Sequence, residues 1–152
     1  GIAGASLGGL FALHLALQRP DVFARAAALS PTLWWGNGFV LREIAALPER
    51  PDLRLWLDAG KREPAPLRHL LKTTEELLRD KGWRAHRSAA KADLRCREVA
   101  RAGHDERSWG KRLDRVLKFL FPVPKRTGKR QRSSSTGRSA TSCGPAGRQT
   151  AW

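Results

Sequence analysis

A serine flanked by glycines lies close to the start of the chain, in a Gly-x-Ser-x-Gly motif over residues 4–8. This motif is typical of a nucleophile elbow, a sharp turn from a strand into a helix that exposes one serine hydroxyl. We expect glycine at both Gly4 and Gly8 because the turn is tight and a Cβ at either position would clash. An apolar helical run follows Ser6, so the motif has the sequence context that it needs. The chemistry it indicates is nucleophilic attack by Ser6.

A serine nucleophile needs a base, and histidine is the usual one. His104 follows Ala102-Gly103, after the last predicted strand and directly before a predicted helix, so it can reach back over Ser6. His14 and His69 lie inside predicted helices, and His86 lies in a charged segment, which favours structural or surface roles. We therefore expect His104 to be the base.

The base in turn needs an acid that orients it, and two acids compete for this role. Asp58 is the last side chain of a predicted strand, and Glu63 lies in the loop that follows. Both match the chain order Ser, acid, His of α/β hydrolases. Asp58 could equally form a turn with its own backbone, and Glu63 could be a solvated charge. The spacing does not separate them.

Two further features could complete such a site. The backbone N–H of Leu7, the residue after the nucleophile, would be one oxyanion donor. The second donor should come from a loop that precedes the elbow, which this sequence does not contain; loss of one donor typically costs about 10²–10³ in rate. Trp34 and Trp35 follow the second predicted strand. They could wall an apolar or aromatic acyl pocket, or simply pack over the sheet edge.

The elements that must position these residues alternate between strands and helices. Strands are expected at 1–5, 23–29, 53–59, 83–86 and 96–100, and helices at 7–18, 39–47, 67–81 and 105–121. This order predicts an α/β fold with a parallel sheet and helices on both faces, and such sheets gather functional groups at the carboxyl ends of their strands. The alternation in 53–59 predicts a strand with unlike faces, and the polar stretch 89–95 predicts an irregular excursion.

Composition divides the chain into two parts. We expect residues 1–122 to form one domain and 123–152 to be a disordered basic tail. The net charge is +15, yet the last thirty residues hold seven of the 29 Lys and Arg and no acid. Such a tail can hold phosphate groups of nucleic acid or a membrane surface, or it can be a solvated extension without function. No aromatic or loop motif accompanies the charge, so we expect no specific nucleic-acid partner.

The sequence limits the cellular setting only weakly. It has no run of eighteen apolar residues, so we expect no membrane span. Cys96 and Cys143 lack the spacing of a metal site, which favours free thiols. No signal peptide is visible, which favours a cytoplasmic protein, but a chain that starts at Gly1 without Met looks like a piece of a longer product that could carry one. Localisation and oligomeric state therefore stay open.

Four segments together resemble a known family. Residues 4–9, 30–35, 57–63 and 103–109 look like the putative esterase family of α/β hydrolases, which includes enterochelin and other ferric-siderophore esterases, feruloyl esterases and mycolyltransferases. The resemblance covers residues 1–121, the C-terminal part of such a domain. It implies a partial α/β-hydrolase fold whose N-terminal strands are missing. It also implies Ser6 as nucleophile and His104 as base, and it favours Glu63 over Asp58 as the acid.

The function that follows from the residues and the resemblance is that of a serine carboxylic-ester hydrolase. We expect it to act on a small-molecule ester through an acyl-enzyme, with no metal or organic cofactor. The alternative is a truncated and inactive esterase fragment. In that case the first strand would have an open edge, and apolar helix faces would be bare. Substrate identity stays open in either case.

Overall fold

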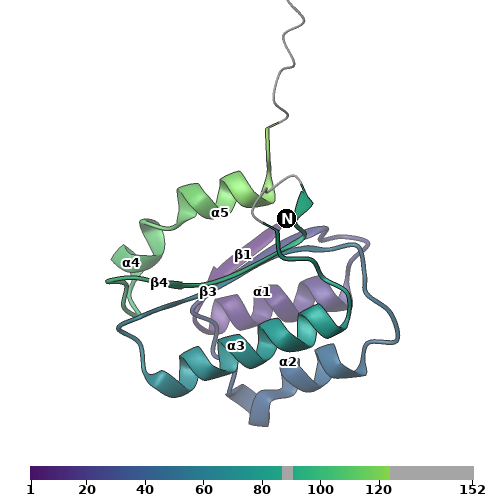
Figure 1. Ribbon diagram of the computed structural model, residues 1–152, viewed down its shortest axis with the longest axis horizontal. Helices are drawn as coiled ribbons and strands as arrows, with labels where there is room; N and C mark the ends of the chain where they lie inside the picture. The colour runs from purple at the N-terminus through teal and green to yellow at the C-terminus, as the bar shows by residue number, and fades with distance from the viewer. Residues whose placement is uncertain (87–90, 124–152) are drawn as a thin grey trace, which may run out of the picture.

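The computed structural model describes residues 1–86 and 91–123, which form a parallel sheet between two layers of helices (Figure 1). The strands of the sheet are hydrogen-bonded in chain order, as β1 (Ile2–Ala5), β2 (Arg25–Leu29), β3 (Arg54–Gly60) and β4 (Leu94–Val99). Every pairing is parallel, with Ala5 opposite Leu29 and Leu29 opposite Asp58. The predicted α/β architecture is confirmed. The carboxyl ends of the strands therefore meet at one edge.

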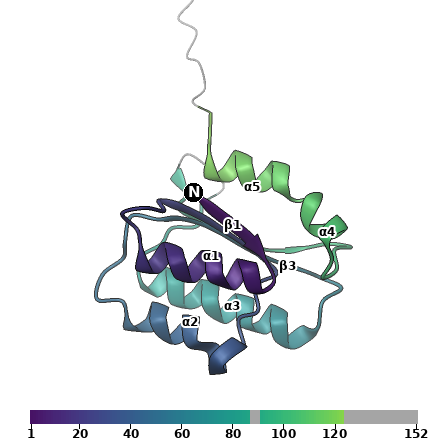
Figure 2. The ribbon, with the colours of Figure 1, turned by 180° about the vertical axis from the view of Figure 1, so that it is seen from behind.

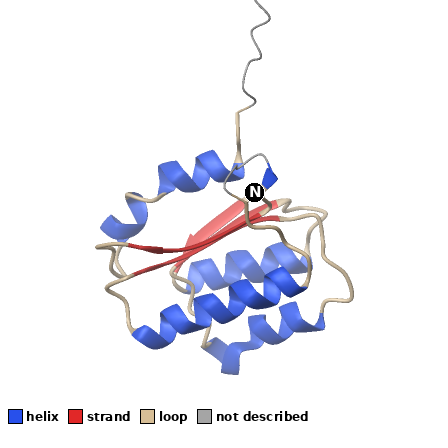
Figure 3. Ribbon diagram, in the orientation of Figure 1, coloured by secondary structure: helices blue, strands red, loops and turns tan. Residues whose placement is uncertain are grey.

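Helices cover both faces of this sheet, as predicted. One face carries α1 (Leu7–Gln18) and α3 (Ala65–Asp80), and α2 (Trp35–Ala46) packs against these two helices (Figures 1 and 3). The opposite face carries α4 (Glu106–Gly110) and α5 (Leu113–Leu120), as the view from behind also shows (Figure 2). Within α2, residues 36–38 have left-handed backbone angles. The regular helix therefore begins after Gly38, as the predicted helix over 39–47 requires.

The larger hydrophobic core lies between the sheet and α1–α3, and a smaller one lies beneath α5. The smaller core joins Trp56 of β3 to Val116, Phe119 and Leu120 of α5. Leu55 and Leu57 are buried on one face of β3, and Trp56 and Asp58 are buried on the other, so both faces are covered. The two faces of β3 therefore differ in polarity, as predicted, but not in exposure. Helix α5 covers the face that carries Trp56 and Asp58.

The region before β4 differs from the prediction. Residues 83–86 form no strand: Ala85 makes only an isolated bridge to Leu94. Trp83 is instead buried against the end of α3 and donates from Nε1 to the Leu53 carbonyl at 3.0 Å. The predicted excursion over 89–95 is wrong at its end, because β4 begins at Leu94 and pairs with Leu55. Its residues 89 and 90 lie outside the described residues.

The predicted single helix over 105–121 is also wrong, because the chain forms α4 and α5 with a break at residues 111–112. Glycine at position 110 weakens a helix interior by about 1 kcal/mol relative to alanine. The Arg112 side chain turns inward, and its Nε donates to the Ser108 carbonyl at 3.1 Å. The apolar face of α5 is consequently Val116, Phe119 and Leu120, whereas Leu113 and Leu117 are exposed.

Apolar side chains are exposed along one side of α1. Leu7, Phe11 and Leu15 follow one another at helical spacing and are 41%, 54% and 37% exposed. They lie on the helix that packs against β1, an edge strand of the sheet. These three side chains form an apolar surface stripe on α1.

The predicted basic tail lies outside the described residues, apart from Val123. The domain boundary at residue 122 therefore stays a prediction. Within 1–86 and 91–123, none of the helices has both the length and the apolar composition needed to cross a bilayer.

Candidate active site

Ser6 occupies the turn between β1 and α1 with φ 54° and ψ −122°, a conformation that residues other than glycine rarely adopt. Its backbone N–H donates to the Leu29 carbonyl at 2.9 Å, which ties the turn to the end of β2. A Cβ on Gly4 would lie 2.2 Å from the Gly8 carbonyl oxygen. The strand and the helix are thus in close contact at Gly4, as the motif predicts.

The prediction for the second flanking glycine is wrong. A Cβ on Gly8 would meet nothing within 4 Å, because this position faces away from the strand. The close approach falls instead on Gly9, where a Cβ would lie 3.0 Å from the Gly4 carbonyl oxygen and 3.2 Å from that of Leu29. The tight packing of the elbow therefore involves Gly4 and Gly9.

His104 lies in the loop after β4 and contacts two of the predicted site residues. Its Nε2 is 2.9 Å from Ser6 Oγ, and its Nδ1 is 3.1 Å from Glu63 Oε2. The ring also packs edge-on against Trp109, with centroids 5.1 Å apart. The fold therefore joins Ser6, His104 and Glu63 in one hydrogen-bonded chain across three strand ends.

Glu63 is buried, with no exposed side-chain surface. Its Oε1 accepts from the Gly60 amide and from the Ser30 hydroxyl, both at 2.6 Å, which leaves Oε2 to face His104. Gly60 also permits the loop before His104 to approach, because a Cβ there would lie 2.2 Å from the Ala102 carbonyl oxygen. The end of β3 and the loop after β4 are thereby held together.

Asp58 is buried and has other partners. Its Oδ1 accepts from Arg112 Nη1 at 2.6 Å, and its Oδ2 accepts from Trp56 Nε1 at 2.9 Å. Burial raises the pKa of Asp58 above its usual value, and the Arg112 guanidinium acts in the opposite direction. Its carboxylate oxygens are thus both engaged by residues other than His104.

An N-cap fixes the loop that carries His104. The Asp105 carboxylate accepts from the Ser108 amide and from the Ser108 hydroxyl, both at 2.8 Å. Both hydrogen bonds lower the pKa of Asp105, and the one from the Ser108 hydroxyl has the larger effect. The Gly103 amide donates to Ser108 Oγ at 3.1 Å, so both neighbours of His104 are tied to the start of α4. Sequence inspection missed this cap, although Asp directly before a helix is a recognisable N-cap signal.

Leu7 is the first residue of α1, so its backbone N–H has no acceptor within the helix. This amide follows Ser6 directly and lies at the positive end of the helix dipole. It is therefore suited to stabilise negative charge next to the serine hydroxyl.

An apolar cavity of about 510 Å³ adjoins His104. Its other lining residues are Trp34, Pro64, Pro66 and Leu67. Trp34 thus lines the cavity beside the predicted base, whereas Trp35 does not and is 56% exposed. The two tryptophans are adjacent in the sequence, but only Trp34 lines this cavity.

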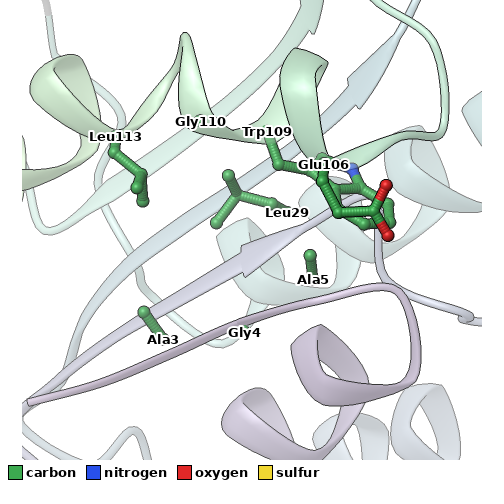
Figure 4. Close-up of a pocket in the computed structure, with 8 residues that line it drawn as sticks. All are labelled: Ala3, Gly4, Ala5, Leu29, Glu106, Trp109, Gly110 and Leu113. Atoms are coloured by element: carbon green, nitrogen blue, oxygen red, sulfur yellow. The ribbon is translucent and has the colours of Figure 1, made fainter.

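A second apolar hollow, of about 290 Å³, lies beside β1 on the face covered by α4 and α5 (Figure 4). Leu29, Trp109 and Leu113 border it, together with Ala3 and Ala5 of β1. Neither Ser6 nor His104 lines it. In the described parts of the chain, no three His, Cys, Asp or Glu side chains are grouped so that they could hold a metal ion.

Comparison with known proteins gives a consistent result. A family model described as Putative esterase matches residues 1–120. The siderophore enterobactin esterase of Emericella nidulans is 38% identical over 82 residues, which is 50% of this chain and 27% of that protein. The uncharacterised protein YbbA of Bacillus subtilis is 26% identical over 128 residues, which is 80% of this chain and 48% of that protein.

Solved structures that resemble this chain include two siderophore-cleaving enzymes. The enterobactin esterase of Shigella flexneri in the presence of enterobactin matches with a TM-score of 0.64 and 29% identity, over 78% of this chain and 29% of that one. The siderophore hydrolase EstB of Aspergillus nidulans matches with a TM-score of 0.59 and 26% identity, over 80% of this chain and 49% of that one. The chain spans half or less of the length of each of these relatives.

Proposed function

The chain belongs to the putative esterase family, and from that premise we propose that it is a serine carboxylic-ester hydrolase of the α/β-hydrolase superfamily. The hydrogen-bonded chain from Ser6 through His104 to Glu63 supports this proposal more than any other observation. It links a hydroxyl, an imidazole and a buried carboxylate in the order that acyl transfer by serine requires.

In the proposed reaction, Ser6 Oγ attacks the ester carbonyl carbon while His104 Nε2 accepts the hydroxyl proton. Glu63 stabilises the imidazolium that forms and holds its Nδ1–H. The Leu7 amide stabilises the oxyanion of the tetrahedral intermediate. His104 then returns the proton to the departing alkoxide, which leaves an acyl group on Ser6. Water, deprotonated by the same histidine, releases the acid and restores the enzyme.

The cavity beside His104 supports a proposal about the substrate. Trp34 presents an aromatic surface, and Pro64, Pro66 and Leu67 add apolar walls. A site of this kind suits a small-molecule ester with an apolar or aromatic group next to the scissile bond. The relatives that are named as siderophore esterases make a siderophore-type ester the substrate class to test first.

The proposal is tested with an active-site probe and a chromogenic ester. We expect a fluorophosphonate to label the chain covalently at Ser6, and we expect 4-nitrophenyl butyrate to be hydrolysed. Both reactions should be lost in Ser6→Ala. Labelling does not need a complete catalytic cycle, so it also tests the alternative of an inactive fragment. A folded chain that resists the probe, or a Ser6→Ala variant that reacts like the wild type, would overturn the proposal.

A further inference from the structure

A buried serine lies behind Glu63, on the side away from His104. Ser30 follows β2 directly and has no exposed surface. Its Oγ is 2.6 Å from Glu63 Oε1, 3.1 Å from Trp109 Nε1 and 3.1 Å from Arg112 Nη2. One hydroxyl therefore connects the carboxylate of the site to two side chains of the C-terminal region.

The chemistry of these partners fixes the direction of each hydrogen bond. An indole N–H and a guanidinium can only donate, so Trp109 and Arg112 both donate to the Ser30 oxygen. A hydroxyl has two lone pairs and a single proton, and the two donors occupy the lone pairs. The proton must then point to Glu63 Oε1. The Ser30 hydroxyl is thus held as a donor to Glu63 and cannot rotate into another role.

Arg112 is itself held in place from two sides. Its Nη1 donates to Asp58 Oδ1 at 2.6 Å, and its Nε donates to the Ser108 carbonyl at 3.1 Å. Arg112 and Asp58 are both buried, so their charges compensate each other beneath the site. A fixed guanidinium therefore orients the hydroxyl that in turn orients Glu63.

The backbone of Ser30 is held in an uncommon conformation. Its φ is 46°, in the left-handed region, and its N–H donates to the Asp58 carbonyl at 2.8 Å. Glycine would adopt this conformation with less strain, but glycine has no hydroxyl. Outliers of this kind often mark positions where the surrounding structure imposes a functional geometry.

We propose that Ser30 is a positioning residue, which together with Arg112 and Trp109 fixes the Glu63 carboxylate so that Oε2 faces His104. The proposal rests on the function proposed above. Glu63 Oε1 receives two donors, from Ser30 and from the Gly60 amide, and this leaves Oε2 for the imidazole. His104 is thereby kept with its proton on Nδ1 and with Nε2 ready to accept the proton of Ser6.

The test compares Ser30→Ala with Ser30→Gly. Both variants lack the hydroxyl, but glycine also removes the backbone strain. We expect kcat for 4-nitrophenyl butyrate to fall by about 10- to 100-fold in each, by analogy with the removal of hydrogen-bond partners that orient metal ligands. KM should stay within about twofold. Fluorophosphonate labelling should slow in parallel with kcat.

A spectroscopic measurement separates positioning from folding. The ¹⁵N chemical shifts of His104 report which ring nitrogen carries the proton, and they do so without turnover. We expect the wild type to carry the proton on Nδ1 and both Ser30 variants to show an increased share of the Nε2–H tautomer. Thr74→Val is the matched control, because Thr74 is buried and its hydroxyl donates to the Leu70 carbonyl in α3, remote from the site. It removes a buried hydroxyl at a distance from the site, so kcat and the His104 tautomer should stay unchanged.

Wild-type kcat and wild-type tautomer in the Ser30 variants would overturn the proposal. So would a loss of rate in Ser30→Ala that Ser30→Gly restores, because backbone strain would then be the cause. Failure of the proposed function looks different: Ser6→Ala would then retain labelling and hydrolysis. In that case the His104 tautomer would still decide whether Ser30 orients Glu63.

Discussion

Arg112 Nη1 lies 2.6 Å from Asp58 Oδ1, in an ion pair whose side chains are 4% and 0% exposed. The spacing in the sequence makes Asp58 and Glu63 equal candidates for the acid that orients His104. Their contacts in the structure differ. Asp58 is engaged by Arg112 and Trp56, whereas Glu63 is hydrogen-bonded to His104. The two acids, five positions apart, therefore lead to different predictions.

Replacing Glu63 should affect catalysis. In Glu63→Gln the amide oxygen can accept from Ser30 and Gly60, so the NH₂ group would face His104 Nδ1. The imidazole would then carry its proton on Nε2 and could not accept one from Ser6. We expect kcat to fall by about 10⁴, as for the wrong tautomer in a serine protease triad. Steady-state kinetics with 4-nitrophenyl butyrate measures the effect.

Replacing Asp58 should affect stability. Asp58→Asn leaves the Arg112 charge buried without its counter-ion, which typically costs about 3–5 kcal/mol. Urea unfolding followed by circular dichroism measures the change. At a temperature where the variant is folded, its kcat should exceed that of Glu63→Gln. The opposite order of kcat values would identify Asp58 as the acid.

The two glycines that flank Ser6 should differ in their tolerance of alanine. A Cβ at position 4 would lie 2.2 Å from the backbone oxygen of Gly8, which cannot move without unwinding α1. We expect Gly4→Ala to lower the free energy of unfolding by about 1–3 kcal/mol or more. Gly8→Ala should be neutral or slightly stabilising, because the position is open and alanine favours a helix. Thermal melts of both variants test this, and equal losses would contradict it.

The two adjacent tryptophans should differ in their effect on substrate binding. Trp34→Ala removes the aromatic wall of the cavity beside His104, so KM for an aromatic ester such as 4-nitrophenyl benzoate should rise by about 3- to 10-fold. Trp35→Ala, the matched control, should leave KM unchanged. In Trp34→Ala, KM for 4-nitrophenyl acetate should rise less than KM for the benzoate. A KM for the benzoate in Trp34→Ala equal to that of the wild type would show that Trp34 does not contribute to substrate binding.

The Asp105 cap should make stability depend on pH in the acid range. The pKa of Asp105 is lower in the folded chain than in the unfolded one. Its contribution to stability is therefore fully present above the unfolded value of about 4 and is lost as the pH falls through the lowered folded pKa. Asp105→Asn lacks this titration. The difference in Tm between wild type and Asp105→Asn should narrow between pH 7 and pH 3, and a constant or widening difference would contradict the assignment.

Much of the architecture could be predicted because local patterns agree with the final packing. The apolar runs over residues 23–29 and 53–59 became central parallel strands, and helix α1 has the predicted bounds. The pattern failed where a side chain contacts a segment distant in the sequence. Trp83 is apolar enough for a strand but is buried beside α3, and Arg112 interrupts a helical pattern because its guanidinium reaches Asp58. Neither contact leaves a signal in the local sequence.

The sequence alone determined that Ser6 stands at a strand-to-helix turn and that His104 follows the last strand, since both depend on local turn chemistry and on the order of elements. It left Asp58 and Glu63 equivalent until a family resemblance favoured Glu63, and it did not indicate that Ser30 contacts Glu63. Only the tertiary structure places Glu63 beside His104 and Asp58 beside Arg112, because the orientation of a buried carboxylate depends on donors from distant segments. Ser30 and Arg112 are 82 positions apart, and they meet only when α5 packs on the sheet.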